Sequence, residues 1–384
     1  MTNQKNSIDN EMEVPFFVPL ITKEDKNVIK TVLNSTLLTS GPKLEKFEKD
    51  FAKFTGSKYA IGVSNATAAL QLALKTLNIG KGDEVLIPDL TFVATASSVL
   101  NNNATPVLVD VEKDSFNISV KSLKKKITSK TKAMIIVHFA GKSCNMKEIL
   151  KIVKENDIYL IEDCAHAIGT KYQQRHVGTF GDIGCFSFYP TKNITTIEGG
   201  MVITNSKKTQ EKIKSLRNHC MTKSLSQRYK IGNPWDYDVI EPGYNFRLDE
   251  IRSALGSSQL IRIKKLNDLR RNACKYYNKK LKKVKGIIVP EISKNDSCHL
   301  YIIRITKNYG ISRDQLYKKL LKNKIRTTVH YKPLHKFSVF KKYNNLKKNL
   351  SNTTQLYEEI LSLPLYPQIL KKHQDKVIKY ISEK

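Results

Sequence analysis

The chain has 384 residues, of which 40% are hydrophobic and 26% are charged, and its formal net charge is +31. This length and apolar content suffice for one large domain and one smaller domain with a substantial buried core. No apolar run approaches the length that spans a bilayer, the polar start MTNQKNSIDN has no signal-peptide core, and the six cysteines form no C-x-x-C pair, so we expect a cytoplasmic protein with no membrane partner, no disulfide framework and no metal site.

Short β-rich runs alternate with helical patterns from residue 58 to about residue 205. The expected strands are Tyr59–Val63, Glu84–Pro88, Pro106–Val111, Ala133–Phe139, Ile158–Asp163, Cys185–Phe188 and Met201–Thr204. Helical periodicity separates most of them, as in Ala68–Leu77 and Met146–Glu155. This alternation predicts an α/β protein with a mostly parallel sheet that helices cover on both faces.

Lys- and Leu-rich helical patterns dominate from Asp249 onward. A β pair, Gly286–Pro290 and His299–Ile305, interrupts them, and a helix over Ser312–Asn323 follows. We therefore expect a large α/β domain over residues 13–250 and a smaller α+β C-terminal domain over residues 251–384, with the boundary near residues 245–260. Residues 1–12 are expected to be a flexible N-terminus.

Two residues carry the strongest chemical signal of the chain. Asp163 ends an apolar strand in IEDCAHAIG, and Lys192 follows 29 positions later, in FSFYPTKNITTIEGG, between another apolar strand and a glycine pair. A carboxylate that keeps a pyridinium nitrogen protonated and a lysine that forms a Schiff base are the groups that pyridoxal phosphate chemistry requires. The pair therefore predicts a pyridoxal 5'-phosphate (PLP) cofactor.

Four other features gain a functional meaning beside this pair. Ser64–Leu70 lies at a strand-to-helix turn, where free N–H groups bind a phosphate, although the same residues also suit an ordinary helix cap. Phe92 is either a core aromatic or a ring that stacks on the cofactor. His166 is either structural or a donor to the phenolic oxygen of the cofactor, and the hydroxyl of Ser187 is a candidate phosphate ligand.

A series of motifs in fixed order carries a family resemblance. These motifs are LTSGP, SNATAAL, PDLTFVATA, EDCAHAIG, FSFYPTKN, EGG, EPGYNFRLDEI, VHYKPLH and SLPL. With them the chain resembles the DegT/DnrJ/EryC1/StrS family of sugar aminotransferases from Phe17 to about Pro367. The resemblance implies the aspartate-aminotransferase-like fold, which is fold type I of the PLP-dependent transferases.

The resemblance also implies a role for each matching residue. Lys192 would hold the cofactor, Asp163 would pair with its pyridinium nitrogen, and His166 would contact its ring oxygen. The other cofactor contacts would come from Ala66, Thr67, Phe92 and Ser187. Asn245 would reach the phosphate of the cofactor in a neighbouring subunit, so a homodimer with shared active sites is implied. Substrate-side candidates, each with an alternative as a turn, cap or packed ring, are Thr39, Ser40, Tyr189, His330, Tyr331 and His335.

The resemblance implies an aminotransferase that moves an amino group from glutamate to the keto carbon of a nucleotide-linked sugar, a UDP-4-keto sugar in the first instance. Within the family, EDCAHAIGTKYQQRHVG, KNITTIEGG and GISRD most resemble aminotransferases that make 4-amino-4-deoxy-L-arabinose on UDP and related UDP-4-keto-sugar aminotransferases. One alternative is a PLP-dependent sugar dehydratase. Such relatives replace the lysine with histidine, so Lys192 favours transamination.

The net charge of +31 supports a third reading, a PLP-binding regulatory or nucleic-acid-binding protein. The excess lysines lie on amphipathic stretches such as residues 121–132 and 262–285, and neither arginine–aromatic interleaving nor zinc-finger spacing accompanies them. A charge run of this kind usually forms a solvated helix face. We therefore do not expect nucleic acid to be the main partner.

Overall fold

The computed structural model describes residues 12–223, 233, 235–340, 343 and 350–383. The predicted flexible N-terminus, residues 1–12, lies outside the described residues except for Met12. Helices α2 (Lys23–Leu33) and α3 (Pro42–Thr55) precede the first strand. A capping box formed by Thr22 and Asp25 begins α2, and Gly56 in the left-handed conformation ends α3.

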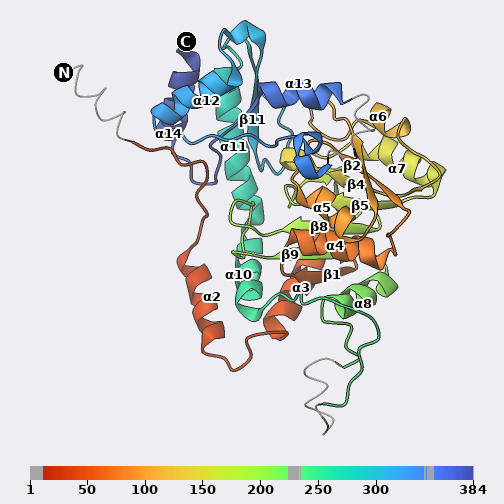
Figure 1. Cartoon of the computed structure of the whole chain (residues 1–384). Helices are drawn as coiled ribbons and strands as arrows, with labels where there is room; N and C mark the ends of the chain where they lie inside the picture. Colours follow the sequence, from red (N-terminus) through yellow and green to blue (C-terminus); the bar gives the residue numbers. More distant parts are fainter. Residues whose placement is uncertain (1–11, 224–232, 234, 341–342, 344–349, 384) are drawn as a thin grey trace.

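A seven-stranded sheet forms the centre of the molecule (Figure 1). Its strands are β1 (Tyr59–Val63), β2 (Glu84–Pro88), β3 (Thr105–Val109), β4 (Thr131–Val137), β5 (Tyr159–Asp163), β8 (Ile183–Ser187) and β9 (Gly200–Thr204). The spatial order is β1-β9-β8-β5-β4-β2-β3. Neighbouring strands from β3 to β8 are parallel, whereas β9 is antiparallel to both β8 and β1. The predicted mostly parallel sheet is thus confirmed.

Helices cover both faces of this sheet, as the continuous burial of its strands requires. They are α4 (Ala66–Thr76), α5 (Ala94–Asn101), α6 (Val120–Lys124), α7 (Met146–Asn156) and α8 (Lys207–Leu216). Alternate residues of β2 enter different cores: Val85 and Ile87 pack with the α4 and α5 residues, and Leu86 packs with α7. A third apolar cluster joins α3 to β8 and β9.

The C-terminal part packs on a separate apolar core. It contains α10 (Glu250–Leu260), α11 (Ile263–Leu281), β10 (Ile287–Ile288), β11 (Tyr301–Ile305), α12 (Arg313–Lys322), α13 (Ser351–Glu359), β12 (Ile360–Leu363) and α14 (Lys371–Ser382). Strands β10, β11 and β12 form an antiparallel sheet, and one cluster joins α11, α12 and α14 to it. Helix α10 packs instead against α2 and α3. The division at residue 250 stays a prediction.

Several short elements escape prediction from the sequence. The hairpin of β6 (Lys171–Tyr172) and β7 (Arg175–His176), and the 3-10 turns η1 (Phe139–Gly141), η2 (Lys307–Tyr309) and η3 (Leu334–Lys336), are too short for a periodic pattern. Strand β12 was not expected as a strand either. Among the helices that the structure describes, none combines the length and the apolar character needed to cross a membrane.

Candidate active site

A cavity of about 520 Å³ opens where the parallel strands β2, β4, β5 and β8 end at their carboxyl ends. Ligands bind at this edge in open α/β sheets. The cavity collects ten of the residues predicted from the sequence: Ala66, Thr67, Phe92, Asp163, His166, Ser187, Tyr189, Lys192, His330 and Tyr331. Asn65, Leu70, Thr91, Ala94, Val137, Ala165, Thr191 and Glu198 complete its lining.

Four predicted residues do not line this cavity. Thr39 forms an isolated bridge with Asp249, and Ser40 follows it with a φ of 54° just before α3. Asn245 is exposed in an extended segment. The fourth, His335, lies on η3, where its Nδ1 is 2.5 Å from a carboxylate oxygen of the buried Asp89. Within this chain, that hydrogen bond gives His335 a structural environment.

Asp163 is the last residue of β5 and is buried at the floor of the cavity. One carboxylate oxygen accepts the N–H of Ala165 at 3.0 Å, and the other accepts the hydroxyl of Thr95 at 3.3 Å. The Thr95 hydroxyl is also 2.9 Å from that of Thr91. Burial raises the pKa of Asp163, and the two hydrogen bonds and Lys192 only partly oppose this effect.

Lys192 reaches the same cavity from the loop after β8. Burial lowers its pKa to about 8, although the charge of Asp163 acts in the opposite direction. The neutral, nucleophilic form of this amine is therefore more accessible near neutral pH than that of an ordinary exposed lysine. The next residue fixes the loop, because the Asn193 amide donates to Asn267 at 2.7 Å and to the carbonyl of Ser297 at 2.8 Å.

The N-terminus of α4 forms another wall. The Asn65 side chain caps this helix by accepting the N–H of Ala68 at 2.8 Å. Helix geometry leaves the N–H groups of Ala66 and Thr67 without intrahelical acceptors. Gly200 on β9 lets the two segments approach, since a Cβ there would lie 2.6 Å from the Asn65 carbonyl carbon. These N–H groups and the nearby Ser187 hydroxyl suit an anion.

His166 and Tyr331 are bonded to each other across the cavity. Burial lowers the pKa of His166 well below its usual value, so the imidazole is neutral. Its Nδ1 accepts the N–H of Ala140 at 3.3 Å, and its Nε2 is 3.0 Å from the Tyr331 hydroxyl. We therefore assign the imidazole hydrogen to Nε2, which donates to Tyr331. The hydroxyl hydrogen of Tyr331 remains available to another acceptor.

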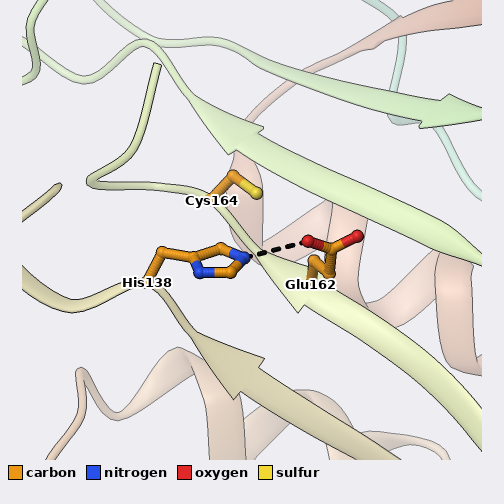
Figure 2. Close-up of side chains that lie close together, drawn as sticks. All are labelled: His138, Glu162 and Cys164. Atoms are coloured by element: carbon orange, nitrogen blue, oxygen red, sulfur yellow. Dashed lines mark hydrogen bonds and ion pairs between the residues drawn. The ribbon is translucent and has the colours of Figure 1, made fainter. Parts of the chain in front are cut away.

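A second polar group lies on the opposite side of β5. Figure 2 shows His138, Glu162 and Cys164, with the His138 Nε2 3.0 Å from a Glu162 oxygen. The other ring nitrogen of His138 accepts the N–H of Cys144, and Glu162 accepts the N–H groups of Gly178, Phe180 and Gly181 at 2.7 Å each. Burial keeps the pKa of the Cys164 thiol well above its usual value. Because the His138 and Glu162 atoms already have partners and the Cys164 thiol stays protonated, we assign no metal here.

The cavity fits PLP by the chemistry of its donors. A carboxylate suits the pyridinium nitrogen, a partly neutral lysine suits the aldehyde, and two N–H groups with a hydroxyl suit the phosphate. The ring of Phe92, which is 55% exposed and lies 5.8 Å from the Tyr331 ring, is free to stack on a planar ligand. Together the fold and these donors define a PLP-dependent transferase of fold type I.

Comparison with known proteins places the chain within this class. The DegT/DnrJ/EryC1/StrS aminotransferase family matches residues 19–382, and the chain belongs to that family. The spore coat polysaccharide biosynthesis protein SpsC from Bacillus subtilis (strain 168) is 37% identical to it over 375 residues, 96% of each chain. The recognition of the family from the sequence motifs is thus confirmed.

Solved structures agree. Spr1654 from Streptococcus pneumoniae in its PLP form has a TM-score of 0.89 at 29% identity, covering 97% of this chain and 98% of that one. PseC from Helicobacter pylori, an aminotransferase involved in the biosynthesis of pseudoaminic acid, has a TM-score of 0.89 at 32% identity, with coverages of 96% and 98%. PLP is therefore the cofactor, and the chain is a PLP-dependent aminotransferase of the sugar aminotransferase family.

One protein of similar structure is an enzyme of another class, a dehydratase. The GDP-4-keto-6-deoxymannose-3-dehydratase ColD has a TM-score of 0.88 at 26% identity, covering 96% of this chain and all of that one. The fold alone therefore does not select transamination.

Several residues at or next to the cavity were not singled out from the sequence, among them Thr91, Thr95 and Glu198. Thr91 and Thr95 stand four positions apart in PDLTFVAT, and only the packing of α5 against the end of β5 brings Thr95 to Asp163. Glu198 lines the cavity from the loop before β9. A threonine pair or a lone glutamate in a loop gives no signal of its own.

Proposed function

We propose that this aminotransferase moves an amino group from glutamate to the keto carbon of a nucleotide-linked keto-sugar, a UDP-4-keto sugar in the first instance. The observation that carries the proposal is the convergence of Asp163, Lys192 and the free α4 N-terminus on one cavity of about 520 Å³. That volume holds a cofactor and a substrate sugar together. The family and the polysaccharide and pseudoaminic acid pathways of its relatives support a sugar acceptor.

Each residue has a definite task in this proposal. When bound, PLP supplies the electron sink for the pair left behind as the donor's Cα–H bond breaks. The Asp163 carboxylate holds the proton on the pyridine nitrogen, which keeps that sink effective. The Nζ of Lys192 would take the Cα proton and pass it on to a different carbon, because its return to Cα would only reverse the step. The N–H groups of Ala66 and Thr67 and the Ser187 hydroxyl anchor the phosphate.

We extend the proposal to the other predicted residues. Tyr189, His330 and Tyr331 line the cavity and would contact the substrate, and the hydroxyl hydrogen of Tyr331, left free by His166, would donate to the cofactor or the substrate. Asn245 is exposed and lies outside the cavity lining, so a homodimer is needed for it to reach a cofactor phosphate in a second copy. Thr39 and Ser40 also lie outside the cavity lining, and we keep them as candidates for contacts with the substrate.

Two alternative functions are a sugar dehydratase and a PLP-binding regulatory protein. A sugar dehydratase is favoured by the similarity to ColD, and Lys192 in the cavity argues for transamination instead. A PLP-binding regulatory protein would have the same cofactor site without turnover of glutamate.

The test begins with the visible absorption spectrum of the PLP-loaded protein before and after glutamate is added without any sugar. We expect the visible band to disappear while 2-oxoglutarate forms in an equal amount. Keto-sugars on UDP, dTDP and GDP are then offered, and restoration of the band identifies the acceptor. A band that persists with glutamate would overturn the glutamate assignment. A product that has lost a ring hydroxyl and gained no amine would favour the dehydratase.

A further inference from the structure

The positive charge is concentrated in the last third of the chain. Residues 1–250 contain 34 lysines and arginines against 27 acidic residues, a net charge of +7, whereas residues 251–384 contain 32 against 8, a net charge of +24. Both parts belong to one chain, so a compositional bias common to the whole sequence does not produce this difference. The surplus calls for an explanation specific to the C-terminal part.

The arginines of this part have partners within the protein. Arg262 binds Asp25 at 2.7 Å, Arg304 binds Glu359 at 2.8 Å, and the buried Arg270 donates to main-chain carbonyl groups. Several acidic residues on the same helices are also bound: Asp268 by Arg271, Asp314 by Arg313 and Asp375 by the Tyr276 hydroxyl. The net charge of these helices therefore rests on lysines.

Three helices present these lysines together. Helix α14 packs against both α11 and α12, and each helix buries an apolar side in the same core, through Tyr277, Leu316 and Val377. Figure 1 shows α12 and α14 beside the upper part of α11, which continues from there towards the middle of the molecule. We call their outer side the basic face and define it by the exposed lysines Lys275, Lys279, Lys318, Lys322, Lys372 and Lys379. Within the part of the chain that the structure describes, none of the six forms an ion pair, and none lines the active-site cavity.

We propose that the basic face docks this enzyme on an anionic lipid bilayer. Three helices side by side give a broad surface, and lysines act as hydrated point charges that attract an anionic surface without a fixed geometry. Sequence-specific recognition of nucleic acid relies on base-edge contacts, for which arginine is the commonest side chain, and Arg262, Arg270 and Arg304 are already bound within the protein. Docking here leaves the cavity free and revises the expectation that the protein has no membrane partner.

The test is co-sedimentation of the PLP-loaded protein with phosphatidylcholine vesicles that contain or lack phosphatidylglycerol. We expect binding only to the vesicles with phosphatidylglycerol, and loss of binding as NaCl is raised. The variant Lys275→Glu/Lys318→Glu/Lys372→Glu changes one lysine on each helix. It should bind the anionic vesicles at least about a hundredfold more weakly, because three lysines that attract the anionic surface are replaced by acidic residues.

A matched control carries Lys147→Glu, Lys151→Glu and Lys154→Glu on the exposed side of α7, which changes the net charge of the protein equally. Figure 1 shows α7 far from the three helices. This control should bind within about twofold of the unmodified protein if the lysines of the basic face, and not the net charge of the whole protein, determine binding. Equal losses in both triple variants, or no binding to anionic vesicles, would overturn the proposal. Tighter retention by duplex DNA than by these vesicles at the same salt would assign the face to nucleic acid instead. Since the assay needs no turnover, failure here does not bear on the proposed transamination.

Discussion

Two adjacent carboxylates of β5, Glu162 and Asp163, have opposite environments. Both are buried, and successive strand residues point to opposite faces of the sheet. Glu162 accepts three backbone N–H groups at 2.7 Å and faces His138, and these bonds lower its pKa despite burial. Asp163 accepts one N–H group and one hydroxyl, and burial raises its pKa. The fold itself supplies all the partners of Glu162.

Asp163, by contrast, has few partners within the fold: the N–H of Ala165, the hydroxyl of Thr95 and the charge of Lys192. A buried carboxylate with few donors costs free energy unless a positive group approaches it. A pyridinium nitrogen is such a group, and its proton would be held by this carboxylate. A buried carboxylate whose hydrogen-bond partners all come from the fold, such as Glu162, stabilises this sheet. A buried carboxylate that faces the cavity and has few donors, such as Asp163, marks the ligand site.

The largest effect is expected for Lys192→Ala, which removes the amine that faces Asp163. The glutamate half-reaction should slow by at least about 10³-fold, because both a nucleophile and a proton carrier are lost. Formation of 2-oxoglutarate in a single turnover measures this loss. Lys171→Ala, an exposed lysine on β6, serves as the control and should react at the unmodified rate. Undiminished turnover in the Lys192 variant would sink the assignment of this residue.

Asp163→Asn and Glu162→Gln test the contrast directly. Asp163→Asn should slow the glutamate half-reaction by roughly 10²–10⁴-fold, the range of a positioned acid or base. It should also raise the unfolding free energy of the PLP-free protein at pH 7, because the raised pKa of Asp163 makes its ionised form unfavourable there. Glu162→Gln should instead destabilise the protein by about 3–5 kcal/mol, since it breaks a buried charged network.

Single-turnover kinetics give the rate of the glutamate half-reaction for each variant, and urea unfolding gives the free energy of unfolding of each. The contrast fails if Glu162→Gln is as stable as the unmodified protein, or if Asp163→Asn reacts at the unmodified rate.

The sequence predicts most of the sheet because its strands are short apolar runs. Tyr59–Val63 and Glu84–Pro88 match β1 and β2 at both ends. A run such as Met201–Thr204 carries no information on direction, so the antiparallel placement of β9 came only from the structure. The lysine and the carboxylate were recognisable because their spacing and flanking residues form motifs.

Contacts between distant segments were beyond the sequence. His166 meets Tyr331 across 165 positions, and Thr95 meets Asp163 across 68. No local pattern encodes such pairs, because packing of whole helices against the sheet decides them. The same holds for His335, whose hydrogen bond with Asp89 depends on how η3 lies against the end of β2.

A smaller effect concerns pH. The lowered pKa of Glu162 means that its stabilising contribution is fully present above its usual value of 4.5 and is lost as pH falls through its value in the folded protein. The difference in unfolding free energy between the unmodified protein and Glu162→Gln should therefore shrink as pH falls below 4.5. Urea unfolding at a series of pH values measures it. A difference that stays constant down to the acid limit would mean that His138, not the carboxylate charge, governs this group.

The smallest effect is expected for Thr95→Val, which removes one of the two donors to Asp163 while keeping the shape of the side chain. A single hydrogen bond of 3.3 Å contributes about 1 kcal/mol, so the glutamate half-reaction should slow about fivefold. Thr91→Val is the matched control, because Thr91 bonds to Thr95 and not to the carboxylate. Its rate should stay closer to that of the unmodified protein. If the glutamate half-reaction slowed equally in both valine variants, the threonine pair would act through the packing of α5. The hydrogen bond from Thr95 to Asp163 would then not be what sets the rate.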